Sequence, residues 1–407
     1  MHEGRGTHRG NRERDRRGRP RACEGNDRQR WRRAVNQQTS RNLSPFDLLA
    51  RSWQRPAAVA AVCFSADAVA FTSVDGSVAI GPVADQEPPE SRTRVSGDLG
   101  QTTIRPRQKP PAPLIATSVL GDGDEPLTSY LRSGFLVGTT TGQALHLAAD
   151  GEVTETPINI EGPIVAIDHN DGTATTAISN GHDVFLSRAH GGMVKLQQAA
   201  SSSTHAIAFS PNGKQLAFDS GNGMSIWTVD GDPVPLRDFS TPTGLTSLRW
   251  SGDSSWLACG LETGGFVLAR PADGQSAIVG GFPSPVRTVC WSRPANALFA
   301  SGAFRIAGWS MAAPPLHDAA SGALVTGRSG LVPVETVAAH PQRKIIAAGY
   351  TNGRITVCQI GSPDELVVKL AGSMITALAW SDDGRHLAAG MVDGTAAIIT
   401  FPALLFK

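Results

Sequence analysis

Short apolar runs alternate with turn residues along residues 43–407. Clear examples are Leu216 to Phe218, Ile345 to Ala348 and Leu387 to Ala389. Runs of this length that are bounded by turn residues indicate β-strands rather than helices. Gly and Pro are also frequent, with 44 and 27 residues, which disfavours a helical bundle. The pattern predicts an all-β protein.

Two marks recur in these runs and define a repeat of about 40 residues. The first is an aromatic–Ser pair followed by turn residues, as at Phe209, Trp250 and Trp291, which are spaced 41 residues apart. The second is a turn about a dozen residues later, in which Asp-Gly or Asn-Gly favours a hairpin because both residues tolerate positive φ. This turn occurs eight times, at Asp75-Gly76, Thr141-Gly142, Asn180-Gly181, Asn222-Gly223, Thr263-Gly264, Phe304-Arg305, Asn352-Gly353 and Asp393-Gly394.

The residue four positions before the second residue of each of these turns is small, with one exception. A strand crowded near a central axis needs small side chains at one level, as radial packing predicts. Each unit of about 40 residues then holds four strands and forms one blade of a β-propeller. We count eight units, and seven blades remain the alternative because the Ile115–Asp150 unit diverges. The exception is Asp219; the other seven are Thr72, Gly138, Ala177, Gly260, Ser301, Gly349 and Gly390.

Residues 43–407 resemble the WD-repeat β-propellers in three motifs. These are the aromatic-Ser-x-x-Gly turn, the Leu-Ala-x-Gly strand and the Asp-Gly turn, and Trp227 and Trp309 resemble the tryptophan of the family's third strand. The chain departs from the family pattern because it has no Trp-Asp dipeptide and no Gly-His pair at the start of a repeat. The resemblance implies the fold of a β-propeller, and this implication concerns the fold alone.

The two ends of the chain are expected to close the ring. The last unit, Met374 to Lys407, supplies three strands, and the segment Phe46 to Trp53 can supply the fourth. Pairing of the N-terminal and C-terminal strands would leave no exposed sheet edge in the ring.

Residues 1–42 differ from the rest of the chain. They hold 13 Arg, no Lys and 5 acidic residues, a net charge of +8, so the remaining residues carry −7. Three interpretations are open: an Arg-rich disordered tail without function, a tail that binds nucleic acid or acidic lipid, or a start assigned too early, with synthesis beginning near Val35. The Ala-, Gly- and Arg-rich composition is typical of a GC-rich bacterial genome.

A Pro-rich insertion at residues 84–113 interrupts the repeat, and its six prolines predict an extended or disordered segment. Arg105, Arg107 and Lys109 lie at one end of it. A second insertion near Met311–Ser321 contains His317 and Asp318. For both insertions, a partner-docking arm and a tolerated surface loop remain alternatives.

Candidate chemistry is sparse in this sequence. Four of the five cysteines lie in apolar runs without a C-x-x-C pair, which indicates buried free thiols. No nucleophile elbow, phosphate-binding loop or familiar metal-ligand spacing occurs, so we expect no enzyme and no cofactor. Asp219 is the one residue singled out, either as a channel residue that holds a ligand or, more commonly for such a residue, as a cap of a backbone N–H.

These observations favour a cytoplasmic, monomeric, non-catalytic scaffold whose partner is another protein. No signal peptide is recognisable, and no apolar run approaches the ~18 residues that span a membrane. The mildly acidic body predicts no binding of nucleic acid by the propeller. The alternatives are a channel that binds a ligand or carries an activity, and a periplasmic propeller of the Tol type, which the segment Ala208 to Gly231 resembles locally.

Overall fold

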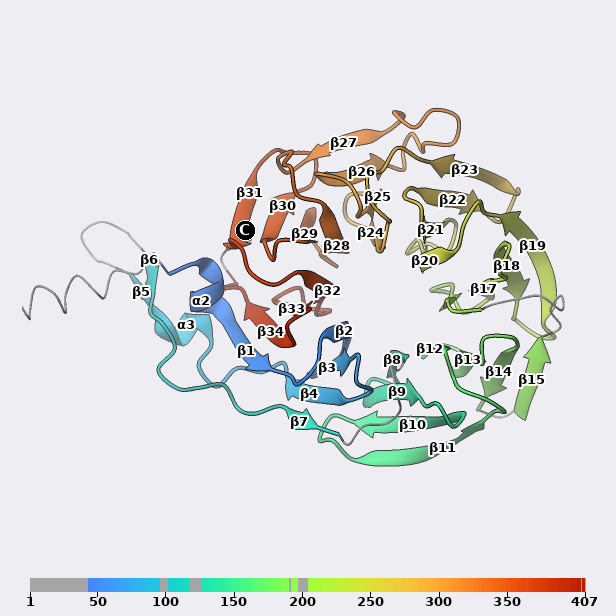
Figure 1. The fold of residues 1–407 in the computed structure, drawn as a ribbon, viewed down its shortest axis with the longest axis horizontal. Helices are drawn as coiled ribbons and strands as arrows, with labels where there is room; N and C mark the ends of the chain where they lie inside the picture. Colours follow the sequence, from blue (N-terminus) through green and yellow to red (C-terminus); the bar gives the residue numbers. More distant parts are fainter. Residues whose placement is uncertain are drawn as a thin grey trace, which may run out of the picture. The chain divides into compact units, whose positions relative to one another are not determined.

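The computed structural model describes residues 43–95, 102–117, 126–189, 192–196, 204–403 and 405–406. Within them, eight four-stranded antiparallel sheets form the blades of a ring (Figure 1). The prediction of an all-β propeller with eight blades is confirmed. The Arg-rich segment 1–42 lies outside the described residues. Among those described, no helix is long and apolar enough to cross a membrane.

The strands of each blade run in order from the innermost to the outermost. Blades 1 to 4 are β2 (Val59–Ser65), β3 (Ala68–Ser73), β4 (Val78–Pro82) and β7 (Ile115–Ala116); β8 (Leu127–Tyr130), β9 (Gly134–Gly138), β10 (Gln143–Ala148) and β11 (Val153–Asn159); β12 (Ala166–Asn170), β13 (Thr175–Ser179), β14 (Val184–Arg188) and β15 (Gly192–Leu196); β16 (Ile207–Phe209), β17 (Gln215–Asp219), β18 (Gly223–Thr228) and β19 (Val234–Ser240).

Blades 5 to 8 follow the same order. They are β20 (Leu245–Trp250), β21 (Leu257–Leu261), β22 (Phe266–Arg270) and β23 (Gln275–Val279); β24 (Val289–Ser292), β25 (Ala297–Ala300), β26 (Ile306–Ser310) and β27 (Ala323–Thr326); β28 (Val334–Ala339), β29 (Ile345–Tyr350), β30 (Ile355–Gln359) and β31 (Glu365–Lys369); β32 (Ile375–Trp380), β33 (His386–Met391), β34 (Thr395–Thr400) and β1 (Ala50–Gln54).

Blade 8 closes the ring with strands from both ends of the propeller. Strand β1 pairs with β34 along its whole length, from Ala50 opposite Ile399 to Gln54 opposite Thr395. The predicted closure is therefore confirmed, although the closing strand begins at Ala50. The residues before it form a short helix, α2 (Pro45–Leu49), which Ser44 and Asp47 start with a capping box.

The loops of the propeller lie on two opposite faces. The connections between blades meet the turns that join second and third strands, as where Val392 donates its amide to the carbonyl of Met374 (3.0 Å). We call this side the connection face. The first hairpin turn of each blade meets the loop that follows the third strand, as where the Met311 amide donates to the Asn296 carbonyl (2.8 Å). This second side is the turn face.

The small residues in the second strands mark the contact between consecutive blades. A Cβ added to Gly349 of β29 would lie 2.5 Å from Ile375 at the start of β32, and one added to Gly390 would meet Val59 of β2 in the same way. The sequence predicts these small residues from crowding near the central axis, and at Gly349 and Gly390 the crowding comes from the neighbouring blade. The next blade requires them, because its first residue packs directly on the glycine.

Apolar side chains fill the layers between blades. One such cluster joins Phe266 and Leu268 of blade 5 to Leu298 and Trp309 of blade 6, and all four are buried. Similar clusters lie between the other blades. The core is thus a ring of inter-blade layers.

The blade contact predicts the effect of Gly349→Ala. The new methyl group overlaps Ile375, so the variant should lose about 1–3 kcal/mol of unfolding free energy. Gly280→Ala is the matched control, since a Cβ there has nothing within 4 Å and should leave stability unchanged or slightly raised. Chemical denaturation of both variants measures the difference, and equal stabilities would contradict the packing argument.

Candidate functional site

The Pro-rich insertion is folded in the residues that the structure describes. It contains a helix, α3 (Pro89–Arg92), and a two-stranded sheet of β5 (Thr93–Val95) and β6 (Thr102–Ile104). The predicted extended or disordered segment is therefore wrong for residues 89–95 and 102–104, while residues 84–88 and 105–113 form no helix or strand. Pro89 occupies the first turn of α3, where the missing N–H costs nothing, so proline here starts a helix. In Figure 1 the insertion lies outside the ring beside α2 and β1.

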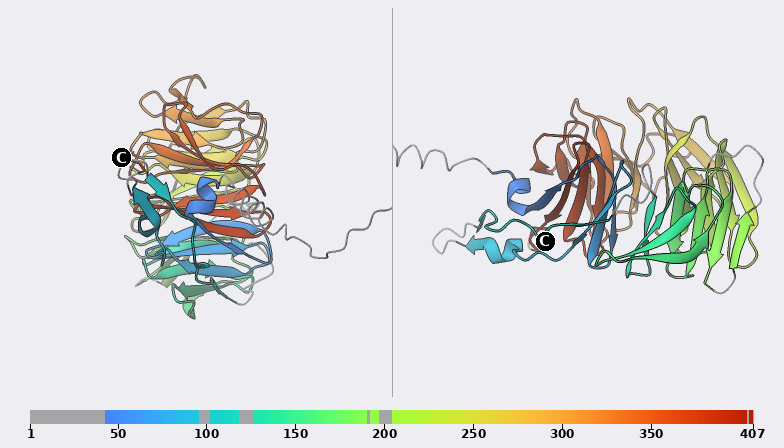
Figure 2. Two further views of the ribbon diagram at one scale, coloured as in Figure 1. Left: turned by 90° about the vertical axis from the view of Figure 1, so that its left-hand side faces the viewer. Right: turned by 60° about the horizontal axis from the view of Figure 1, so that its bottom comes forward.

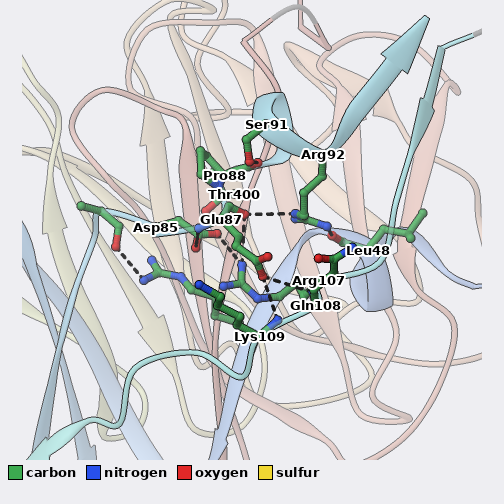
Figure 3. A network of polar contacts seen from close by, with 12 residues as sticks. Leu48, Asp85, Glu87, Pro88, Ser91, Arg92, Arg107, Gln108, Lys109 and Thr400 are labelled. Atoms are coloured by element: carbon green, nitrogen blue, oxygen red, sulfur yellow. Dashed lines mark hydrogen bonds and ion pairs between the residues drawn. The ribbon is translucent and has the colours of Figure 1, made fainter.

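Arg92 holds the insertion to the start of the propeller (Figure 3). Its side chain is buried and donates to three backbone carbonyls: Leu48 in α2 (2.8 Å), Glu87 (3.0 Å) and Arg105 (2.7 Å). A single guanidinium thus joins both ends of the insertion to the helix that precedes the closing strand.

Arg51 makes the reciprocal connection. It lies in β1, is buried, and donates to the carbonyls of Pro82 (2.9 Å), Val83 (2.6 Å) and Ala84 (2.9 Å) at the start of the insertion. Strand β1 belongs to blade 8, whereas Pro82 ends β4 of blade 1. The two arginines therefore attach β1 and α2 to the end of blade 1 and to the insertion, and we call them the closure arginines because β1 is the strand that closes the ring.

Carboxylates of the insertion engage its predicted basic residues. Arg107 forms an ion pair with Asp85 (2.6 Å), and Glu87 accepts the backbone amide of Lys109 (3.0 Å; Figure 3). Burial opposes ionisation of Asp85, but the hydrogen bonds from Arg107 and the Glu87 amide hold its pKa below the usual value. The Lys109 amide likewise lowers the pKa of Glu87. Arg105 contributes its backbone to this network, so these residues hold the insertion in place.

The second insertion lies on blade 6, also on the turn face. Trp309 donates its indole N–H to the carbonyl of Ala319 (2.8 Å) and thereby fixes the loop. Asp318 accepts the amide of Ala320 (2.9 Å), and His317 is exposed. The structure does not bring His317 and Asp318 together with the basic residues of the first insertion.

Asp219 caps a turn at the end of β17. Its carboxylate accepts the amide of Gly221 (2.8 Å), and it is not among the described residues that line the central channel. Of the two interpretations from the sequence, the cap of a backbone N–H agrees with the structure. Burial raises the pKa of Asp219, against the opposing effects of the Gly221 amide and His205.

The eight innermost strands enclose a channel of about 690 Å³. Most of its lining is small or apolar, but His205, Arg249 and Arg287 also contribute. Arg287 pairs with Glu335 at 2.6 Å. The sequence analysis missed this group. The sequence could have identified Arg249, because it directly precedes Trp250 of an aromatic–Ser pair and so lies on the innermost strand of its blade.

A buried carboxylate joins three blades beside the channel. Asp168 of β12 accepts the amide of Phe209 in blade 4 (2.8 Å) and the hydroxyl of Thr128 in blade 2 (3.3 Å). Burial raises the pKa of Asp168, whereas the Phe209 amide and Arg249 lower it. These contacts give Asp168 a structural role between blades.

The thiols in the described strands are poor nucleophiles. Burial raises the pKa of Cys63, Cys259 and Cys290 to about 12 and that of Cys358 to about 11. They are free, as the sequence predicted. The described residues also contain no group of three or more His, Cys, Asp or Glu side chains that could hold a metal ion.

Arg92→Leu tests the role of the closure arginines. The substitution leaves three carbonyls without their donor, so we expect a loss of about 2 kcal/mol in unfolding free energy and faster proteolysis within the insertion. Arg94→Leu, on the exposed side of β5, is the control and should behave like the unsubstituted protein. An equally stable Arg92→Leu variant would show that the insertion needs no such anchor.

The raised pKa of Asp219 predicts a pH dependence. Because the folded state binds the proton more tightly than the unfolded state, this group makes stability fall as pH rises above about 4. Asp219→Asn keeps an acceptor for Gly221 and removes the ionisation, so its melting temperature at pH 7 should exceed that of the unsubstituted protein. In acid the two should converge.

Asp75→Asn provides a control of opposite sign. The hydroxyl of Ser77 lowers the pKa of Asp75, so its stabilising effect is present at pH 7 and lost in acid. This variant should melt slightly earlier at pH 7. A lower melting temperature for Asp219→Asn at pH 7 would mean that the ionised Asp219 stabilises the fold.

Comparisons with known proteins agree with this architecture. Residues 365–399 match the family model for the WD domain, G-beta repeat. The match covers β31 of blade 7 and the three inner strands of blade 8, so the sequence repeat is offset by one strand from the blade. No curated protein sequence matches the chain.

Two solved structures are similar in fold. The computationally designed Ika8 protein superposes with a TM-score of 0.63 at 15% identity, covering 87% of this chain and 99% of its own. The β-propeller domain of Cps50 (Swd1) from Myceliophteria thermophila gives a TM-score of 0.48 at 14% identity, covering 68% of this chain and all of its own. The chain is therefore an eight-bladed β-propeller in which residues 365–399 match one WD repeat.

Proposed function

We propose that this protein is a non-catalytic scaffold that binds another protein on the connection face of blades 6, 7, 8 and 1. The observation that carries the proposal is a row of exposed apolar side chains on that face. Leu331 is 93% exposed and Leu370 is 70% exposed, both in connections between blades. Phe304, Val392 and Val74 are exposed in the turns of blades 6, 8 and 1. We call these five residues the apolar arc.

Backbone contacts place the arc on one face. The Gly330 amide donates to the Phe304 carbonyl (2.9 Å), and the Val74 amide donates to the Ala58 carbonyl (3.0 Å). Each arc residue therefore lies where a blade connection meets a neighbouring turn. Exposed apolar residues gathered on one face are typical of protein interaction sites, whereas isolated ones need no explanation.

Charge favours a partner segment that is both apolar and acidic. Arg305 follows Phe304 and Arg328 precedes Leu331 by three residues, and both are exposed. Neither guanidinium forms an ion pair with the described residues. A partner that presents acidic groups beside apolar side chains would complement this part of the arc.

Leu331→Glu tests the proposal. A photo-crosslinking residue at position 331 in cells of the native host should capture a defined protein, whereas the same residue at Val325 should not. Binding of that purified protein should weaken at least tenfold with Leu331→Glu, because a charge enters an apolar contact. Val325→Glu, on the exposed outer strand β27, should change the affinity by less than about twofold.

The outcomes separate the alternatives. Capture at position 331 together with a loss of binding in Leu331→Glu supports the scaffold. Equal capture at both positions, no capture, or unchanged binding in the variant would overturn a docking site on the arc.

A further inference from the structure

A pocket of about 570 Å³ lies on the turn face between blades 5 and 6. This is the size of pocket that holds a small ligand or a side chain. Trp256, Trp291 and Met311 form its apolar part, and Arg293, Asn296 and Asp253 are among its polar residues. We call it the Trp256–Trp291 pocket. It lies on the opposite face of the propeller from the apolar arc and does not depend on the scaffold proposal.

Trp291 is more exposed than its counterparts in other blades. Trp250 and Trp380 occupy the same place before the Ser of the repeat, and they are only 7% and 9% exposed. All three donate the indole N–H to a carbonyl of the preceding blade, in the case of Trp291 to Arg249 (3.0 Å). The three blades thus have the same indole hydrogen bond, but the ring of Trp291 is partly exposed and lines the pocket.

Trp256 is the second tryptophan that lines the pocket. Its backbone holds the position that Gln215 and His386 occupy in blades 4 and 8, where each residue closes the turn with the repeat Ser. The guanidinium of Arg270 lies over its ring at 5.0 Å and pairs with Asp273 at 2.6 Å. An aromatic side chain at this place adds apolar surface that the turn itself does not need.

The turn that holds Arg293 also departs from the pattern of the repeat. In blades 4, 5 and 8 the turn carries an Asn or Asp two residues after the Ser and accepts its hydroxyl, as Asp253 does from Ser251. Blade 6 has Pro294 at that position, and Arg293 precedes it. The guanidinium is exposed and makes no hydrogen bond or ion pair with the described residues.

Gly252 leaves space for the guanidinium of Arg293, and the carboxylate of Asp253 is already hydrogen-bonded to other groups. A Cβ at Gly252 would lie 3.0 Å from the Nε of Arg293, so the glycine allows the guanidinium to lie against the turn of blade 5. Asp253, the carboxylate of the pocket, already accepts hydrogen bonds from the hydroxyls of Ser251 (2.5 Å) and Ser255 (2.7 Å) and from the Ser255 amide (3.1 Å). The pocket is therefore lined by two tryptophan side chains and by the guanidinium of Arg293, which has no hydrogen-bond or ion-pair partner among the described residues.

We infer that the Trp256–Trp291 pocket binds an apolar or aromatic group that carries a carboxylate. The ring or aliphatic part would lie between the tryptophans, and the carboxylate would accept two parallel N–H bonds from Arg293. Two sources share this chemistry: a free small carboxylic acid and the C-terminal residue of a peptide. The inference rests on the pocket residues alone, and it is independent of the apolar arc.

Calorimetric titration of the full chain tests the inference with matched probes. N-acetyl-L-phenylalanine should bind, and N-acetyl-L-phenylalaninamide, which lacks the carboxylate, should bind about tenfold more weakly. Arg293→Gln should remove this preference for the acid. Arg343→Gln, in the corresponding exposed turn of blade 7, is the control and should retain it.

A second variant separates the aromatic contribution from the charge. Trp256→Ala should weaken the acid and the amide alike, and thermal unfolding of each variant reports whether the fold survives. The tripeptide Gly-Gly-Phe distinguishes the sources: tighter binding than the acetylated amino acid indicates a peptide C-terminus, and weaker binding indicates a small acid. Equal binding of acid and amide, no binding at millimolar concentration, or an unchanged preference in Arg293→Gln would overturn the site. None of these results bears on the apolar arc.

Discussion

The direct contact of each blade with the first residue of the next is the constraint on which this fold depends. Where Ile375 packs on Gly349 or Val59 packs on Gly390, no side chain fits between the sheets. The apolar layers of the core form only because the inner strands approach this closely. The small residues of the second strand thus serve the contact between blades, and the ring forms without a Trp-Asp dipeptide.

A ring of blades has one weak point, where its two ends meet. Strand β1 completes blade 8, so the outer strand there is covalently joined to blade 1 and not to the strands beside it. Arg51 and Arg92 hold β1 and α2 to the end of blade 1 and to the insertion by donating to backbone carbonyls, and α2 and the insertion lie together there in both views of Figure 2. The same offset of one strand appears in the sequence, where the WD repeat begins in blade 7 and ends in blade 8.

The sequence predicts the regular part of this structure and not its exceptions. Hairpin turns such as Asp393-Gly394 identify the blades because turn geometry is a local property. The insertion was misjudged because Arg92 binds carbonyls, and backbone acceptors far apart in the chain leave no pattern in the residue types. Asp219 stood out by its charge but only caps a turn, whereas Asp168, hidden in a turn motif, joins three blades.

Equivalent positions in different blades show which features of a residue the fold requires. Trp250 and Trp380 show what the framework requires of a tryptophan at this place, and Trp291 meets that requirement while remaining partly exposed. Asp253 shows what the turn of blade 5 uses, and blade 6 has Pro294 at that position, directly after Arg293. A surface residue that departs from the repeat and lies beside a pocket, or in a group of exposed apolar residues, is a candidate contact for something outside the chain. For Leu331 that reasoning points to an apolar protein surface, and for Arg293 it points to a carboxylate.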